Sequence, residues 1–204
     1  MSEILELIAA AALDPAAYQA EFERQAATEP GPDADAETRE HWEFTGLNLH
    51  RTNRIARTWR PSAELAALLA RLPGPQTWLA VTEPWCGDSA QCLPCIAALA
   101  AARDDIDLRL VLRDAHPEIM DRYLTNGSRS IPILVGLDAA GTELFRWGPR
   151  PAAAQDVVVA ARAEGLAKPD VLERLHLFYG RNRGQALDAE FVAVFAAVAG
   201  GGRA

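Results

Sequence analysis

Short apolar runs separated by proline and glycine dominate the middle of the chain. Residues 76–81, 106–112, 133–135 and 143–147 are apolar runs of strand length, bounded by turn-forming residues. Such runs are typical of strands in a buried sheet. The alanine-rich segment 96–102 follows the first run and predicts a helix. The alternation of strands and helices indicates an α/β fold, with a central mixed sheet and helices on both faces.

Helical patterns flank this central region on both sides. Asp14 and Pro15 are a typical N-cap and first helical residue, and they separate a helix at the N-terminus from a second one that ends near residue 27. Further helix starts follow Pro61, Pro151 and Lys168. We therefore expect three parts: an acidic N-terminal helical extension at 1–72, a central domain at 73–165, and a C-terminal helical extension at 166–204 that packs on the core.

The segment Trp85-Cys86-Gly87-Asp88-Ser89 lies where the first strand leads into its helix. The unpaired N–H groups and positive end of a helix N-terminus lower the pKa of a thiol, which makes Cys86 a candidate nucleophile. We expect Cys86 to be more acidic than a free thiol for this reason. The carboxylate of Asp88 acts in the opposite direction, and the sequence alone does not decide which effect is larger.

Two separated motifs resemble one known family. The segment from Trp85 to Ser89, with Pro94 in the following helix, resembles the Trp-Cys-Gly-Pro-Cys active site of the thioredoxin superfamily. Ser130-Ile131-Pro132 resembles the cis-proline loop that faces this cysteine in the family. The resemblance implies a thioredoxin-like fold over about 76–165.

The same resemblance implies roles for the motif residues. Trp85 and Gly87, together with Ile131 and Pro132 on a cis Ile131–Pro132 bond, are the expected substrate-binding residues. Ser89 stands where the family's resolving cysteine is found, and a Cys-Gly-Asp-Ser pattern is similar to monothiol members.

The expected catalytic residues are therefore Cys86, Ser89 and Asp88. The Cys86 thiolate would attack a disulfide sulfur and form a mixed disulfide. An outside thiol, with glutathione as a possible co-substrate, would release it.

Cys92 and Cys95 allow three interpretations. They form a Cys-x-x-Cys pair, which could be a redox pair or half of a metal site, although it falls inside the predicted helix. Cys92 is also a possible resolving thiol for Cys86, but six residues along a helix rise about 9 Å, beyond the Cα separation of a disulfide. The interpretation that we favour is core packing of two small apolar side chains.

Composition and charge restrict the partners and the compartment. The net charge is −8, and residues 1–50 alone carry −9, which argues against a nucleic-acid binder. Neither a signal peptide nor a membrane-spanning run is evident, and three cysteines suit a reducing compartment. We expect a cytoplasmic protein that binds neither nucleic acid nor membrane.

Other candidate sites are weaker. The four histidines, His41, His50, His116 and His176, lack ligand spacing, so no metal is expected. Arginines recur at every third position at Arg51, Arg54 and Arg57, so a helix would place them along one side. This row is either a solvated face or an anion-binding row beside Cys86.

The function that the sequence favours is a monothiol thiol–disulfide oxidoreductase acting on a substrate protein or glutathione. The alternative is a thioredoxin-fold interaction module without redox turnover. An open cleft and a low pKa at Cys86 would favour the enzyme, whereas a buried Cys86 would favour the module.

Overall fold

A four-stranded mixed sheet lies at the centre of the molecule, and the computed structural model describes residues 2–202. The strand order is β2-β1-β3-β4. The strands are β1 (Gln76–Thr82), β2 (Ile106–Leu112), β3 (Ile133–Asp138) and β4 (Glu143–Trp147). β1 pairs parallel with β2 and antiparallel with β3, which pairs antiparallel with β4. The predicted mixed sheet is confirmed.

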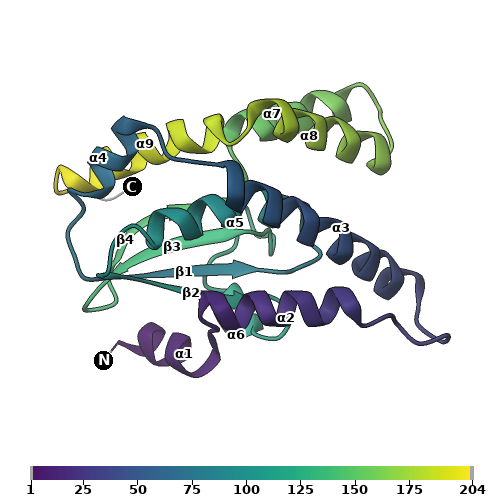
Figure 1. Ribbon diagram of the computed structural model, residues 1–204, viewed down its shortest axis with the longest axis horizontal. Coiled ribbons are helices and arrows are strands. Elements are labelled where there is room, and N and C mark those ends of the chain that lie inside the picture. The colour runs from purple at the N-terminus through teal and green to yellow at the C-terminus, as the bar shows by residue number, and fades with distance from the viewer. Residues whose placement is uncertain (1, 203–204) are drawn as a thin grey trace.

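Helices cover both faces of this sheet (Figure 1). They are α1 (Glu3–Ala11), α2 (Pro15–Ala27), α3 (Ala36–Thr58), α4 (Ala63–Leu69), α5 (Gly87–Ala100), α6 (Pro117–Met120), α7 (Ala152–Ala163), α8 (Lys168–Asn182) and α9 (Gln185–Ala199). α5 follows β1 directly, and α3 packs against α5 while α4 packs against α9. The fold is therefore an α/β thioredoxin-like fold with helical extensions, as the sequence predicts.

Side chains of β1 alternate between two separate buried clusters. Trp78 and Ala80 join the larger cluster with α5 and the end helices, and Leu79 and Val81 join a smaller one with α1 and α6. A strand buried on both faces is apolar throughout rather than alternating. This explains why the sequence shows β1 as one continuous apolar run.

Several helix boundaries follow from local chemistry. The carboxylate of Asp14 accepts a hydrogen bond from Ala17 N at 2.8 Å, and Asp35 caps α3 in the same way through Thr38 N at 2.8 Å. α3 is a single helix of 23 residues. α6 is a single turn of four residues that ends at Met120.

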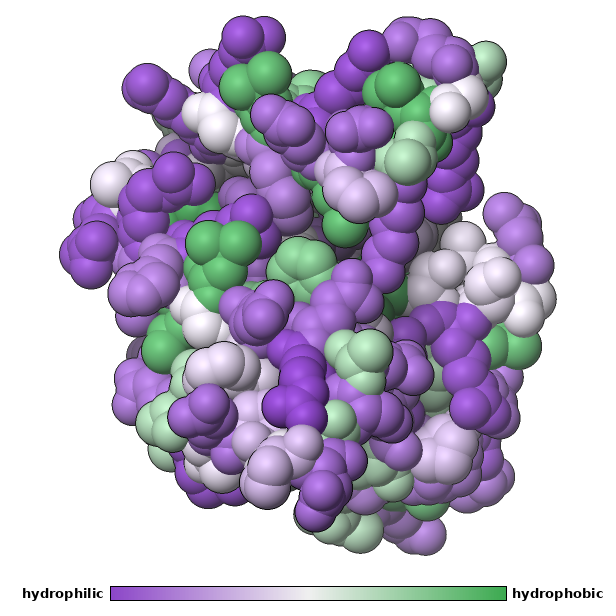
Figure 2. All heavy atoms as spheres, turned by 90° about the vertical axis from the view of Figure 1, so that its right-hand side faces the viewer, coloured by the Kyte–Doolittle hydropathy of each residue, from purple (hydrophilic) through white to green (hydrophobic). Residues whose placement is uncertain are grey.

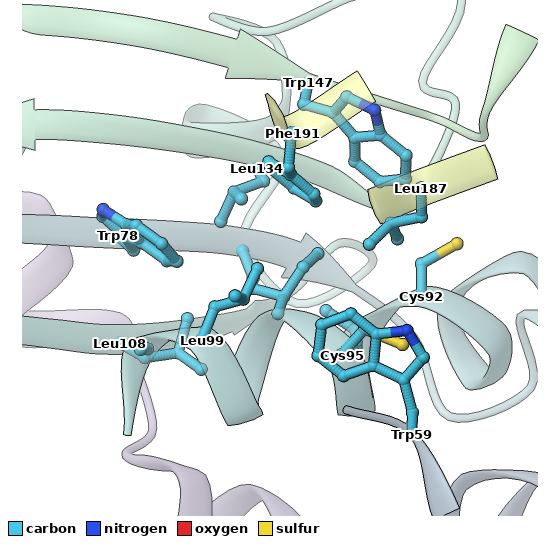
Figure 3. Close-up of a cluster of buried hydrophobic side chains, with 14 of the residues drawn as sticks. Trp59, Trp78, Cys92, Cys95, Leu99, Leu108, Leu134, Trp147, Leu187 and Phe191 are labelled. Carbon is cyan, nitrogen blue, oxygen red and sulfur yellow. The ribbon is translucent and has the colours of Figure 1, made fainter. Parts of the chain in front are cut away.

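The helices outside 73–165 contribute to the same core as the sheet. Figure 3 shows Leu187 and Phe191 from α9 beside Trp147 of β4, with Trp59, the residue after α3, at the edge of the cluster. Phe195 of α9 is fully buried and its ring centroid lies 5.6 Å from that of Trp78. The helices before and after the central region therefore contribute buried side chains to the core and do not lie only on its surface.

Candidate functional site

Cys86 is the N-cap of α5, directly after the turn that leaves β1. Its Sγ donates a hydrogen bond to the backbone oxygen of Ile131 at 3.4 Å and accepts one from the N–H of Ser89 at 3.5 Å. The Ile131–Pro132 peptide bond is cis. The structure therefore brings together the two motifs that are 45 residues apart in the sequence.

Ser89 lies one turn into α5 and beneath Cys86. Its hydroxyl accepts a hydrogen bond from the hydroxyl of Thr82 at 2.8 Å, and both groups are buried. Hydrogen bonding from the side chain and backbone of Ser89 favours the Cys86 thiolate. Ser89 can therefore stabilise a thiolate at Cys86, but a hydroxyl cannot resolve a disulfide.

Asp88 belongs to a buried polar cluster and not to the solvated rim. One carboxylate oxygen accepts from the hydroxyl of Tyr179 at 2.5 Å, and the other pairs with Arg150 at 2.6 Å. Arg150 lies on the loop before α7, and its guanidinium offsets part of the charge of the Asp88 carboxylate.

The resting thiol of Cys86 is less acidic than a free thiol. Burial, and to a lesser extent the charge of Asp88, raise the pKa of Cys86 to about 11, although the hydrogen bonds from Ser89 act in the opposite direction. The side chain is 8% exposed. The expectation of an acidic Cys86 is therefore wrong for the resting structure, because desolvation outweighs the helix terminus.

Cys92 and Cys95 lie in the larger core cluster, whereas Cys86 belongs to the smaller one. Figure 3 shows both side chains within that cluster, with Cys95 beside Trp59. All three cysteines are free. Burial raises the pKa of Cys95 to about 12 and the pKa of Cys92 well above its usual value. Both residues are therefore packed in the core, in a different buried cluster from Cys86.

Two residues of α3 hold the loop before Cys86. The fully buried amide of Asn48 donates to the backbone oxygen of Pro84 at 3.1 Å and accepts from Arg51 at 2.8 Å. The ring of His41 stacks on Trp85 with centroids 4.3 Å apart and planes within 6°. Of the arginine row, Arg51 is half-buried beside the site, and the other two members are exposed to solvent.

α8 covers the site from the other side. A Cβ on Gly87 would lie 2.8 Å from the ring of His176, so a larger residue at this position would require the His176 ring to move. Burial and the charge of Arg51 lower the pKa of His176 to about 4, which keeps this imidazole neutral at pH 7. Sequence reasoning missed the site residues Asn48, His176 and Tyr179, because neither spacing nor a motif links α3 and α8 to Cys86.

A cavity of about 290 Å³ opens beside Cys86. Trp85, Gly87 and Ile131 line it with Asp88 and Arg150, and most of the other lining residues belong to α3 and α8. Figure 2 faces this end of the sheet and shows a mostly polar surface with a recess below α7 and α8. The predicted substrate-binding residues Trp85, Gly87 and Ile131 therefore share one cavity wall with Cys86.

No cluster of three or more potential metal-ligating side chains occurs within residues 2–202. Within the same residues, none of the helices is both long enough and apolar enough to cross a membrane.

Comparison with known proteins identifies one family model, described as thioredoxin, which matches residues 36–164. This region begins at the start of α3, within the part that the sequence assigns to the N-terminal extension. No curated protein matches the chain.

Solved structures with a similar fold cover nearly the whole chain. An HIV epitope scaffold aligns with a TM-score of 0.60 and 19% identity over 94% of this chain and 96% of its own. A protein of unknown function from Pseudomonas aeruginosa aligns with a TM-score of 0.57 and 20% identity over 92% of this chain and 96% of its own. At this identity the two structures show a shared fold that includes the end helices.

A third alignment is partial. The N-terminal domain of the alkylhydroperoxide reductase AhpF from Enterococcus faecalis has a TM-score of 0.39 and 23% identity over 50% of this chain and 49% of its own.

Proposed function

Because the chain belongs to the thioredoxin family, we propose that it catalyses thiol–disulfide exchange through Cys86 alone. The observation that carries this proposal is the position of the Cys86 Sγ. It lies at the N-terminus of α5, 3.4 Å from the Ile131 oxygen, and on the wall of a cavity. Cys92 and Cys95 are buried in a different cluster, which supports release of the mixed disulfide by a thiol from solution.

The proposed reaction has two exchange steps. The Cys86 thiolate attacks one sulfur of a disulfide, a new S–S bond to Cys86 forms, and the other sulfur leaves and takes up a proton. A second thiol from solution then attacks the mixed disulfide and releases Cys86 as a thiol. The net change is exchange of one thiol for the other in the disulfide, and glutathione is a suitable second thiol.

A binding module without redox turnover is the second candidate. The burial of Cys86 and its pKa of about 11 favour it, because at pH 7 about one side chain in 10⁴ is a thiolate at this pKa. Thiol–disulfide exchange fits the site better, since a module has no need of a hydrogen-bonded thiol on the cavity wall. In the proposed function, the low thiolate fraction slows the attack of Cys86 on a disulfide but does not abolish it.

Turnover should require an added thiol and should not depend on Cys92. With bis(2-hydroxyethyl) disulfide as substrate, we expect activity with glutathione, a loss of more than 100-fold in Cys86→Ser, and less than a twofold change in Cys92→Ala. The reduced Ser89→Cys variant should reduce one equivalent of substrate before glutathione is added. Cys86 and the new cysteine would form a local disulfide in this step. Equal rates for wild type and Cys86→Ser would support the binding module instead.

A further inference from the structure

α3 and α8 together enclose the surface around Cys86. The cavity beside it is lined by Phe44 of α3 and by Leu172 and Leu175 of α8, and Leu175 is buried. The ring of His176 contacts the first residue of α5, as the glycine at position 87 allows. The Cys86 sulfur therefore lies in a cavity that has walls on the α3 and α8 sides, and not on a flat surface.

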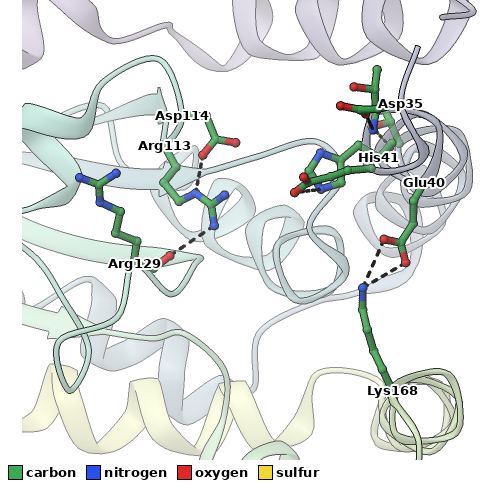
Figure 4. A network of polar contacts seen from close by, with 10 residues as sticks. Asp35, Glu40, His41, Arg113, Asp114, Arg129 and Lys168 are labelled. Atoms are coloured by element: carbon green, nitrogen blue, oxygen red, sulfur yellow. Dashed lines mark hydrogen bonds and ion pairs between the residues drawn. The ribbon is translucent and has the colours of Figure 1, made fainter. Parts of the chain in front are cut away.

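Two polar contacts hold these walls in place. Lys168 at the start of α8 reaches Glu40 on α3 at 3.1 Å, and Figure 4 shows this ion pair spanning the two helices. The hydroxyl of Tyr179 on α8 donates to Asp88 on α5 at 2.5 Å. The exposed ion pair contributes little energy, but the buried contact fixes α8 against the site.

The size of this cavity limits the substrate. Stable protein–protein interfaces bury about 800 Å² on each partner, whereas Cys86 is 8% exposed within a cavity of about 290 Å³. Cavities that enclose small molecules have volumes of about 300–1,000 Å³. A cavity of this size admits a small disulfide to Cys86, and the walls formed by α3 and α8 hinder the approach of a folded protein.

The charges around the cavity favour an anion. Arg150 and Lys168 on its wall are matched by the carboxylates of Asp88 and Glu40. Arg113 is a further cation on the wall, 4.7 Å from the ring centroid of Trp85. It pairs with Asp114 at 2.8 Å (Figure 4), and Asp114 does not line the cavity.

Arg51 adds positive charge behind this wall. Its guanidinium lies 3.9 Å from the position of a Cβ on Gly87, and within residues 2–202 it pairs with no carboxylate. The residues that line the cavity thus include three cations and two carboxylates, in a chain whose net charge is −8.

We propose that the substrate of Cys86 is a low-molecular-weight anionic disulfide, and not a disulfide within a folded protein. The inference rests on the proposed function, since it assigns a substrate class to that thiol. In this arrangement Arg113 is a specificity-determining residue that attracts the anionic group, and α8 excludes larger substrates.

The size of the substrate is tested by comparing small disulfides with insulin. Mixed-disulfide formation at Cys86 is measured by mass spectrometry, and each rate is divided by the rate of the same disulfide with N-acetylcysteine at the same pH. We expect dithiodiglycolate to be favoured over insulin by at least about 100-fold. His176→Ala should raise the insulin rate, whereas His50→Ala, which alters an exposed side chain of α3, should not.

The charge of the substrate is tested by comparing dithiodiglycolate with cystamine, which are small disulfides of opposite charge. We expect the anion to be favoured by at least about tenfold, and Arg113→Gln to reduce this ratio about fivefold. Arg109→Gln is the matched control, because Arg109 also pairs with a neighbouring aspartate, Asp107, at 2.8 Å but does not line the cavity. A structural defect would slow both disulfides equally and would leave the ratio unchanged.

The outcomes separate this inference from the proposed function. Insulin reacting as fast as dithiodiglycolate would overturn the size argument, and equal rates for the two small disulfides would overturn the charge argument. In both cases thiol–disulfide exchange at Cys86 would stand. If Cys86 formed no mixed disulfide with any of these compounds, the proposed function itself would fail.

Discussion

Asp88→Asn should lower the pKa of Cys86 by about one to two units and speed its reaction with disulfides. The substitution removes a negative charge that raises the pKa of Cys86, and it leaves the Arg150 guanidinium without its carboxylate partner. Both changes favour the thiolate. Because a thiolate becomes less nucleophilic as its pKa falls, we expect a rate increase at pH 7 of about threefold to fourfold for each unit.

Thiolate absorbance at 240 nm, followed against pH, measures this change directly. Asp107→Asn is a suitable control, since Asp107 lies on β2 and pairs with Arg109 away from the site. A pKa that rises in Asp88→Asn would contradict the electrostatic account. It would mean that the carboxylate supports the thiolate indirectly, by holding Arg150 in place.

Phe195→Ala should destabilise the whole protein by about 3–5 kcal/mol, which is the usual cost of removing a fully buried phenyl ring. Phe195 lies on α9, outside the predicted central domain, yet it is 0% exposed and contacts Trp78 and Phe145 of the sheet. Urea unfolding should show a single transition at lower denaturant concentration.

The matched control for this substitution is Leu177→Ala on α8. Leu177 is 50% exposed, so its replacement should change the free energy of unfolding by less than about 0.5 kcal/mol. A loss below about 1 kcal/mol in Phe195→Ala, or a separate early transition for α9, would show that the end helices are not part of the core.

The central sheet and the position of Cys86 could be predicted because short, contiguous stretches of sequence specify them. The apolar run of β1 leads directly into the motif around Cys86, and a second motif at Ile131 and Pro132 marks the facing loop. Because Cys86 lies at a strand-to-helix junction, its position at a helix N-terminus depends only on the local sequence.

The enclosure of the site could not be predicted, because it depends on contacts between distant segments. The amide of Asn48 holds the backbone of Pro84, and Tyr179 holds Asp88, but neither residue belongs to a motif. The same contacts bury Cys86 and so decide its pKa. Sequence reasoning identified the opposing effects of the helix terminus and Asp88 on the pKa of Cys86. It did not identify desolvation, which raises this pKa more than the helix terminus lowers it.

The most direct test of a single reactive thiol at Cys86 is the rate of iodoacetamide labelling of each cysteine, followed by peptide mapping between pH 6 and 11. We expect Cys86 to react first and its rate to rise about tenfold per pH unit towards its pKa of about 11. Cys92 and Cys95, which are 1% and 0% exposed, should react only on unfolding. Faster labelling of Cys92 or Cys95 than of Cys86, or a Cys86 rate that is already constant below pH 8, would contradict this account.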